Sequence, residues 1–272
     1  MRIELHCHSI HSDGSERPEN VAARAARRGV ELFCLTDHDS CGGYSATVGM
    51  CPVVLRGLEL SCSAHDRSVH ILCYDAARDD GRWSRLEDRL VELREARKKR
   101  LHAIAEKLAQ LGVPIDIDPI IAASGGRSVG RPDLAQALVD QGRVATLDEA
   151  YRRYLGDGGA AYVGLSRLTV AEGLVLGRDA GAVMALAHPH TLGDLATTLV
   201  RRHRADGLDG LECYYGMYNS RQRRRWLNLA NNLDMTITGG SDFHGDSTPQ
   251  IAEPGIDLPD RYDDQLRAWL GL

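Results

Sequence analysis

Two histidines near the N-terminus have the spacing of metal ligands. His6 and His8 are separated by one residue in an alternating apolar run, so a strand would place both imidazoles on one face. The turn Ser12–Gly14 follows closely and can return Asp13 to the same place. An isolated His-x-His pair is equally compatible with two surface imidazoles. Repetition of the pattern along the chain is what favours a metal site.

Further ligand-type residues follow later apolar runs that we expect to be strands. Residues 31–35, 52–58, 183–187 and 235–239 each lead into a histidine or a carboxylate, with helical patterns between them. His70 differs, because it lies near the beginning of its own run. The alternation of strand and helix favours a parallel sheet with right-handed crossovers. The residues that follow the four runs are His38, Glu59, His188, Asp242 and His244.

These side chains would meet if the strands form a β/α barrel, because the carboxyl ends of barrel strands converge on one face. Imidazoles and carboxylates without thiolates suit Mn²⁺, Fe²⁺ or Zn²⁺. Nine ligands exceed the need of one ion, so we expect two or three divalent ions bridged by the Glu59 carboxylate. The expected ligands are His6, His8, Asp13, His38, Glu59, His70, His188, Asp242 and His244.

Residues 81–159 do not share the alternation of strand and ligand. Apolar residues at helical spacing run through a long charged segment, and shorter helical patterns follow. We therefore expect a barrel built from residues 1–80 and 160–272, interrupted by a helical insertion at residues 81–159.

The composition is that of a soluble globular protein, with 43% hydrophobic residues, 26% charged residues and a net charge of −5. This charge gives no general attraction to nucleic acid or anionic membranes. No signal peptide and no apolar stretch long enough to span a bilayer is visible, so we expect a cytoplasmic protein. Seven cysteines without a Cys-x-x-Cys pair indicate buried, reduced thiols, and the strand alternation turns Cys7 away from its histidine neighbours.

Six short motifs carry the expected ligands. They are His6-x-His8 with Ser12-Asp13-Gly14, Thr36-Asp37-His38-Asp39, Gly57-Leu58-Glu59, Val69-His70, Ala187-His188-Pro189 and Gly240-Ser241-Asp242-Phe243-His244. As a set these motifs resemble the polymerase and histidinol phosphatase (PHP) family. The resemblance extends over nearly the whole chain and is to a stand-alone branch related to 3',5'-nucleoside bisphosphate phosphatase and the short-RNA 5' exonuclease.

The resemblance implies a distorted seven-stranded (β/α) barrel with an inserted helical subdomain and a site for three metal ions. It also implies how the ligands are shared, which the spacing leaves open. In that arrangement the first ion is held by His6, His8, Glu59 and Asp242, the second by Glu59, His70 and His188, and the third by Asp13, His38 and His244.

Two further residues are implied in substrate binding. The segment Ser128-Val129-Gly130-Arg131-Pro132 resembles a motif of the branch whose arginine holds substrate phosphate, as a planar bidentate donor can. A surface arginine at a helix N-terminus is the alternative for Arg131. Asp133 stands where relatives usually have histidine, and His190 follows the His-Pro motif where relatives often have arginine. His190 is expected to replace that arginine as a donor.

The expected function is hydrolysis of phosphate monoesters of small metabolites, nucleotides such as nucleoside 3',5'-bisphosphates in particular, by a metal-bridging hydroxide. Glu59, His190 and Arg131 are the expected catalytic residues. The alternatives are a phosphodiesterase or 5'-3' exonuclease on cyclic or short oligonucleotide phosphates, an amidohydrolase, and a non-catalytic metal-binding PHP module. The oligomeric state stays open.

Two arginine-rich stretches, residues 94–100 and 221–225, are compatible with binding of short oligonucleotides or with solvated helix faces. Tyr214, Tyr215 and Tyr218 are compatible with stacking on a base or with packing at the barrel rim.

Overall fold

The computed structural model describes residues 1–65, 67–123, 129–156, 158–164 and 168–272. The chain divides into two compact units. We call residues 1–88 and 167–272 the barrel unit and residues 89–166 the insertion unit. The boundaries expected from the sequence were 80/81 and 159/160. The boundaries of the compact units, 88/89 and 166/167, lie eight and seven residues later in the chain.

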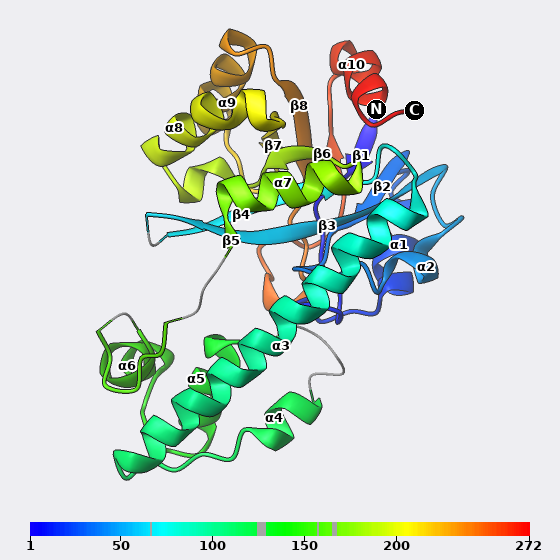
Figure 1. The fold of residues 1–272 in the computed structure, drawn as a ribbon. Helices are drawn as coiled ribbons and strands as arrows, with labels where there is room; N and C mark the ends of the chain where they lie inside the picture. Colours follow the sequence, from blue (N-terminus) through cyan, green and yellow to red (C-terminus); the bar gives the residue numbers. More distant parts are fainter. Residues whose placement is uncertain (66, 124–128, 157, 165–167) are drawn as a thin grey trace. The chain divides into compact units, whose positions relative to one another are not determined.

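One mixed sheet organises the barrel unit (Figure 1). It has nine strands within the described residues, where seven were expected; two of the nine, β5 and β9, are only two residues long. The strand order is β8-β7-β6-β4-β3-β2-β1-β9, and β5 pairs separately with β3. The strands are β1 (Arg2–Glu4), β2 (Leu32–Leu35), β3 (Val53–Ala64), β4 (Arg67–Tyr74), β5 (Leu168–Thr169), β6 (Val183–Leu186), β7 (Leu208–Tyr215), β8 (Thr236–Gly240) and β9 (Ile256–Asp257).

The segment after β1 meets the segment after β8, so the sheet is barrel-like and nearly closed. Cys7 forms a parallel bridge with Phe243. The His8 amide donates to the Phe243 carbonyl at 2.8 Å, and the Asp242 amide donates to the His6 carbonyl at 2.7 Å. The first and the last ligand motifs of the sequence therefore lie side by side.

The direction of β4 explains the unusual position of His70. The pairs β1–β2, β2–β3, β6–β7 and β7–β8 are parallel, whereas β4 is antiparallel to both β3 and β6. The prediction of a parallel sheet is therefore wrong for β4. Because β4 runs in the opposite direction, the beginning of this strand lies at the edge where its neighbours end, and His70 reaches the same edge as the other ligands.

The helices of the barrel unit begin and end as the local sequence dictates. Pro18 occupies the first turn of α1, and the face of this helix that contains Val21 and Ala25 is buried. Thr169 and Glu172 form a capping box at the start of α7, and Gly181 ends it at φ +79°. Helix α9 packs against β7 and β8. The helices are α1 (Pro18–Arg27), α2 (Tyr44–Thr47), α7 (Val170–Ala180), α8 (Asp194–His203), α9 (Ser220–Asn232) and α10 (Asp263–Trp269), with short 3₁₀ turns at Pro189–Thr191, Arg204–Asp206, Gly245–Ser247 and Asp260–Tyr262.

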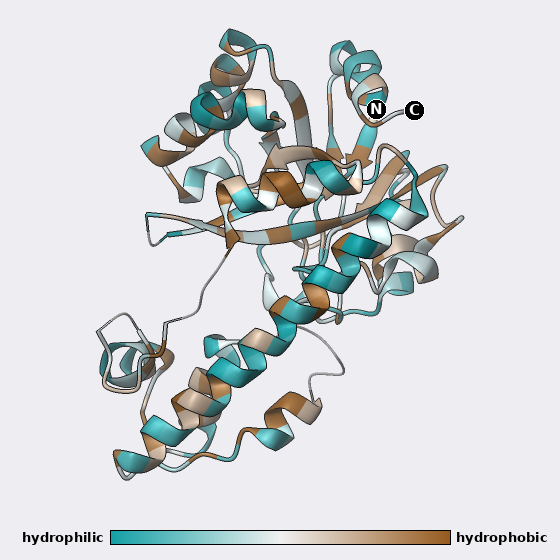
Figure 2. Cartoon of the chain, in the orientation of Figure 1, coloured by the Kyte–Doolittle hydropathy of each residue, from teal (hydrophilic) through white to brown (hydrophobic). Residues whose placement is uncertain are grey.

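Helix α3 (Asp80–Gln110) begins in the barrel unit and continues into the insertion unit. It is mostly hydrophilic, with apolar residues at intervals (Figure 2). Its apolar residues at helical spacing are mostly buried: Leu93 is partly exposed, whereas the others are buried, namely Leu86, Leu90, Leu101, Ile104 and Leu108. The regular elements among the described residues of the insertion unit are all helical: the rest of α3, α4 (Asp118–Ala123), α5 (Arg131–Asp140), α6 (Leu147–Ala150) and the π-helical turn Tyr151–Leu155.

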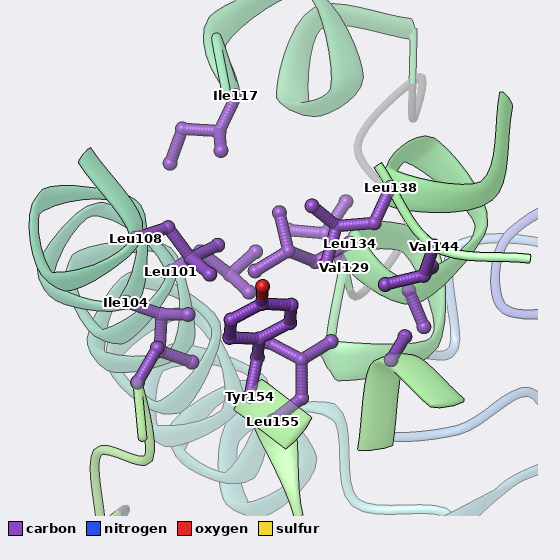
Figure 3. Close-up of a cluster of buried hydrophobic side chains, with 13 residues drawn as sticks. Leu101, Ile104, Leu108, Ile117, Val129, Leu134, Leu138, Val144, Tyr154 and Leu155 are labelled. Carbon is purple, nitrogen blue, oxygen red and sulfur yellow. The ribbon is translucent and has the colours of Figure 1, made fainter. Parts of the chain in front are cut away.

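The insertion unit has an apolar core of its own (Figure 3). Leu101, Ile104 and Leu108 of α3 pack with Leu134 and Leu138 of α5, and all five are at most 2% exposed. The insertion unit is therefore built around a hydrophobic cluster of its own.

All seven cysteines are free thiols in the described ranges; six of them are buried, and Cys41 is partly exposed. Cys7 packs into an apolar cluster with Phe33 and Phe243, on the side of the strand away from His6 and His8. Within the described residues, no helix combines the length and the apolar character that a membrane crossing requires.

Candidate metal centre

Glu59 is the centre of the cluster that the sequence predicted. Its carboxylate is 1% exposed and lies 3.0–3.3 Å from nitrogen atoms of five histidines that come from four separate segments of the barrel unit. Three of the nitrogens face Oε2 and two face Oε1. They are His6 Nε2, His8 Nε2 and His38 Nδ1 on the Oε2 side, and His70 Nδ1 and His188 Nε2 on the Oε1 side.

Strand pairing brings these residues together. The chain after β2 continues alongside β3, because the Asp39 amide donates to the Glu59 carbonyl at 2.9 Å and the Glu59 amide donates to the Asp37 carbonyl at 3.2 Å. His70 pairs with Ser61, two residues beyond Glu59 on β3, so its ring lies on the same face as the carboxylate.

Asp242 completes the buried side of the cluster. Its Oδ1 lies 3.3 Å from both His6 Nε2 and His8 Nε2, and its Oδ2 accepts a hydrogen bond of 2.8 Å from the Tyr215 hydroxyl. Asp242 also has a left-handed backbone at φ +59°. The segment 241–244 that follows β8 thus presents both Asp242 and His244 to the centre.

Asp13 and His244 form the open edge of the cluster. Asp13 Oδ1 lies 3.3 Å from His244 Nε2, and Asp13 Oδ2 lies 3.6 Å from His38 Nε2. The Asp13 side chain is 51% exposed, whereas that of Glu59 is 1% exposed. The cluster is therefore more exposed to solvent at Asp13 than at Glu59.

Three buried carboxylates that the sequence analysis did not assign support these side chains. Asp37 accepts hydrogen bonds from the Ser9 amide and the Ser12 hydroxyl and so holds the loop that carries Asp13. Glu4 accepts from the His6 and Ser241 amides, and Glu212 contacts His6. Their signal was present in the sequence, because Glu4 and Glu212 are carboxylates inside apolar strands.

The donor set fits divalent cations. His6 Nε2, His8 Nε2 and His38 Nδ1 are buried and have no hydrogen-bond partner within the described part of the chain, although each faces Glu59. Buried polar atoms without a partner are costly, and a cation between the rings and the carboxylates would satisfy them. Four sets of three or four of these residues place ligand atoms within 4.8 Å of one another.

The electrostatics of the cluster also suit a cation. Burial lowers the pKa of His38 to about 4, which keeps this ring neutral. Burial favours the neutral form of His8 as well, but the carboxylates of Asp242 and Glu59 outweigh it and raise the pKa of His8 to about 10. Burial raises the pKa of Glu59, but the surrounding imidazoles outweigh it and hold this pKa well below its usual range. The carboxylate at the centre is therefore ionised.

His190 lies beside the cluster rather than within it. Its ring centroid is 6.3 Å from that of His188, and its Nδ1 lies 3.1 Å from the Tyr218 hydroxyl. The His190 backbone amide donates to the same hydroxyl at 3.3 Å. Tyr214, Tyr215 and Tyr218 are 6–8% exposed, so they pack at the barrel rim and offer no open face for stacking.

Arg131 belongs to the insertion unit. Its Nη1 donates to the Leu155 carbonyl at 3.0 Å, and its guanidinium lies about 6 Å from the ring of Tyr162. Asp133, the departure from the branch motif, accepts a hydrogen bond of 2.8 Å from the Gly130 amide and so caps α5. Ser128 of the same motif lies outside the described residues.

The basic stretches contain residues with local partners. Arg225 pairs with Asp194 at 2.7 Å, Lys98 pairs with Glu95 at 2.7 Å, and the Arg223 guanidinium lies 4.7 Å from the centroid of the Tyr214 ring. These contacts are typical of solvated helix faces.

Curated relatives match most of the chain. The PHP domain matches residues 4–125. A 5'-3' exoribonuclease of Haemophilus influenzae is 30% identical over 250 residues, covering 89% of this chain and 90% of its own. A 3',5'-nucleoside bisphosphate phosphatase of Chromobacterium violaceum is 30% identical over 253 residues, covering 89% and 87%. A phosphoribosyl 1,2-cyclic phosphate 1,2-diphosphodiesterase of Eggerthella lenta is 28% identical over 257 residues, covering 90% and 95%.

Two solved structures share the fold. A predicted metal-dependent phosphoesterase from Bifidobacterium adolescentis superimposes with a TM-score of 0.76 at 28% identity, covering 98% of this chain and 95% of its own. An amidohydrolase from Chromobacterium violaceum, with bound sulfate and no metal, gives a TM-score of 0.79 at 27% identity, covering 98% and 96%. With relatives of these names over most of its length, the chain is a hydrolase, and it belongs to the PHP family.

Proposed function

We propose that this chain is a metal-dependent phosphoesterase that hydrolyses phosphate monoesters of small metabolites, nucleoside 3',5'-bisphosphates in particular. The observation that carries the proposal is the buried Glu59 carboxylate with five imidazole nitrogens 3.0–3.3 Å away. A structural histidine cluster would pair its nitrogens with hydrogen-bond partners, whereas three of these nitrogens face carboxylates without one in the described chain.

Two or three divalent ions, Mn²⁺, Fe²⁺ or Zn²⁺, would be held by the nine predicted residues. The short distances are compatible with the implied sharing, because each proposed group contains direct nitrogen–oxygen approaches of 3.0–3.6 Å. His38 is compatible with a second grouping, since its Nδ1 also faces Glu59 together with His70. Glu59 is a ligand in the implied sharing and in this second grouping, and it is the proposed carboxylate bridge between ions.

When bound, such ions supply Lewis acidity and a water of lowered pKa for in-line attack on phosphorus. The side chains of the protein would orient the substrate and supply a proton, and His190 is the proposed proton donor. The Tyr218 hydroxyl accepts the His190 amide hydrogen, so its own hydrogen is left for His190 Nδ1. The neutral ring of His190 then carries its proton on Nε2, where it can donate to a phosphate oxygen or to the leaving alkoxide.

Arg131 and the insertion, residues 81–159, are proposed to contribute substrate contacts. A guanidinium binds phosphate through two parallel hydrogen bonds, which a lysine cannot reproduce. Replacing Arg131 with lysine is therefore expected to raise KM for a phosphate monoester more than it lowers kcat.

The test is release of inorganic phosphate from nucleotides and sugar phosphates, with metal analysis of the same preparation. Turnover is expected to require bound divalent ions. It is expected to fall in Glu59→Gln by more than the about 10–100-fold that follows loss of a partner behind a metal ligand, because Glu59 belongs to the proposed ligand groups of both the first and the second ion. Glu253→Gln is the matched control, since Glu253 is bonded to Arg24 on the outside of the barrel unit. Full turnover by the Glu59 variant with its metal still bound would end the proposal.

A phosphodiesterase is the second candidate, because two relatives are named an exoribonuclease and a cyclic phosphate diphosphodiesterase. Faster turnover of bis-p-nitrophenyl phosphate than of the monoester would favour it. A steep salt dependence seen only with oligonucleotides would favour an exonuclease, because contacts to several phosphates release counterions. Metal binding without any hydrolysis would favour the non-catalytic module.

A further inference from the structure

Glu212 is a fully buried carboxylate at the inner side of β7, between Leu211 and Cys213. A buried charge is retained only where partners compensate for lost hydration. Each oxygen of Glu212 has a partner in a different ligand segment. Oε1 lies 2.8 Å from His6 Nδ1, and Oε2 accepts a hydrogen bond of 2.6 Å from the His188 backbone amide.

The first contact determines which nitrogen of His6 is available. A carboxylate oxygen at 2.8 Å accepts a hydrogen from Nδ1, so the lone pair of a neutral His6 lies on Nε2. This Nε2 lies 3.3 Å from both Glu59 Oε2 and Asp242 Oδ1. Glu212 therefore directs the ligand atom of His6 toward the centre.

The second contact holds a strained residue. His188 has φ +25° and ψ 61°, a conformation that residues other than glycine rarely adopt. With its amide fixed by Glu212, His188 places Nε2 3.0 Å from Glu59 Oε1. His188 thus approaches the oxygen of Glu59 opposite to the one that His6 approaches.

A register shift in β7 allows two side chains of this strand, Glu212 and Tyr215, to contact residues of the cluster. Glu212 pairs with Thr238 of β8, but Tyr214 pairs with the next residue, Gly239. Residues 212 and 215 would lie on opposite faces of a regular strand. With the shift, Glu212 contacts His6 while the Tyr215 hydroxyl contacts Asp242.

We propose that Glu212 is a positioning residue that orients ligands on both oxygens of Glu59 at once, and that it thereby couples the two neighbouring metal positions. The inference rests on the proposed function, because it assumes that divalent ions bind at Glu59. Loss of Glu212 would then weaken metal binding at both positions without removing any ligand.

Glutamine at this position cannot replace the carboxylate. Both partners of Glu212 donate hydrogens, whereas an amide offers one acceptor and one donor. If the amide oxygen accepts from His188, the amide nitrogen faces His6 Nδ1 and favours the tautomer with hydrogen on Nε2. That tautomer presents a hydrogen instead of a lone pair to the metal position.

The experiment is calorimetric titration of metal-free protein with Mn²⁺, comparing wild type with Glu212→Gln. We expect both Mn²⁺ dissociation constants to rise about 10–100-fold, the usual effect of removing a carboxylate behind a metal-bound histidine. Asp209→Asn is the matched control on the same strand, where Asp209 Oδ1 accepts from Trp269 Nε1 at 2.9 Å. The control is expected to bind Mn²⁺ like wild type.

Further measurements separate positioning from a purely structural role. If Glu212→Gln binds Mn²⁺ as tightly as wild type, the inference is overturned, whatever its melting temperature. Glu212→Asp keeps two acceptors on a shorter side chain, so we expect it to bind Mn²⁺ more tightly than Glu212→Gln does. If Glu212→Gln does not fold, Glu212→Asp is compared with wild type in its place. Binding by Glu212→Asp equal to wild type then overturns the inference. Wild type that binds no Mn²⁺, Fe²⁺ or Zn²⁺ overturns the proposed function as well, so the two failures are distinguishable.

Discussion

Substitution of Gly240 by alanine tests whether the centre depends on the close approach of β8 to His6. A Cβ added at Gly240 would lie 2.4 Å from His6 Cβ, 2.5 Å from His6 N and 2.8 Å from His6 Cα. Ordinary contacts begin near 3.4 Å, so the two strands would have to separate by about 1 Å. The His6 backbone cannot move freely, because its carbonyl accepts the Asp242 amide at 2.7 Å.

The expected cost has two parts. Overpacking of this kind destabilises a fold by about 1–3 kcal/mol, which corresponds to a melting temperature lower by about 2–12 °C for a unit of this size. A shift of about 1 Å also moves His6 Nε2 away from Glu59 and Asp242. Misplacement of a reacting or binding group by that distance lowers kcat/KM about 10²-fold.

The assay combines thermal unfolding of the metal-free protein with Mn²⁺ titration and phosphate release. Gly81→Ala is the matched control, because the added Cβ would meet only Asp79 Oδ1 at 3.5 Å in helix α3. Alanine is the better helix former, so the control is expected to be stabilised by up to about 1 kcal/mol. If Gly240→Ala melts at the wild-type temperature and binds Mn²⁺ normally, the close approach of β8 to His6 is refuted.

Three other outcomes are expected. Tyr215→Phe removes the 2.8 Å hydrogen bond to Asp242. Mn²⁺ is therefore expected to bind about 10–100-fold more weakly while the melting temperature changes little. An unchanged Mn²⁺ dissociation constant would contradict this. Protein stripped of metal with a chelator is expected to melt about 5–10 °C below protein that contains Mn²⁺ at 100 times its dissociation constant. Equal melting temperatures for the two samples would mean that no ion binds the folded state. Burial, together with the hydrogen bond to Glu87, raises the pKa of the Cys41 thiol to about 12. Alkylation of Cys41 in the native protein at pH 8 is therefore expected to be roughly 10³-fold slower than alkylation of a free thiol, and its rate is expected to rise with pH. Rapid labelling of Cys41 at pH 8 would contradict this, with Cys41→Ser as the control.

The residues that the structure gathers around Glu59 were predictable from the sequence, because their signal is local. His6 and His8 alternate with apolar residues, and Glu59, His188 and Asp242 follow apolar runs, so each position is encoded within a few neighbours. Convergence at one edge then follows from the geometry of a barrel sheet. The structure brings all nine residues into one cluster around Glu59.

The partners behind the ligands were not predictable in this way. Glu212 is recognisable in the sequence as a carboxylate in an apolar strand, but its contacts with His6 and His188 join residues 206 and 24 positions apart. Asp37 lies inside a motif, yet its role in holding Ser9 and Ser12 depends on how the loop after β1 folds back.

The sequence by itself therefore determined which residue types end the strands, and it predicted from them the chemistry of a divalent metal centre. Only the tertiary structure decided that β4 runs antiparallel and delivers His70 from the start of its strand, and that the register of β7 shifts between Glu212 and Tyr214. The physical reason is the range of the interactions. Side-chain alternation is set by adjacent residues, whereas strand direction, register and barrel closure are set by hydrogen bonds between segments far apart in the chain.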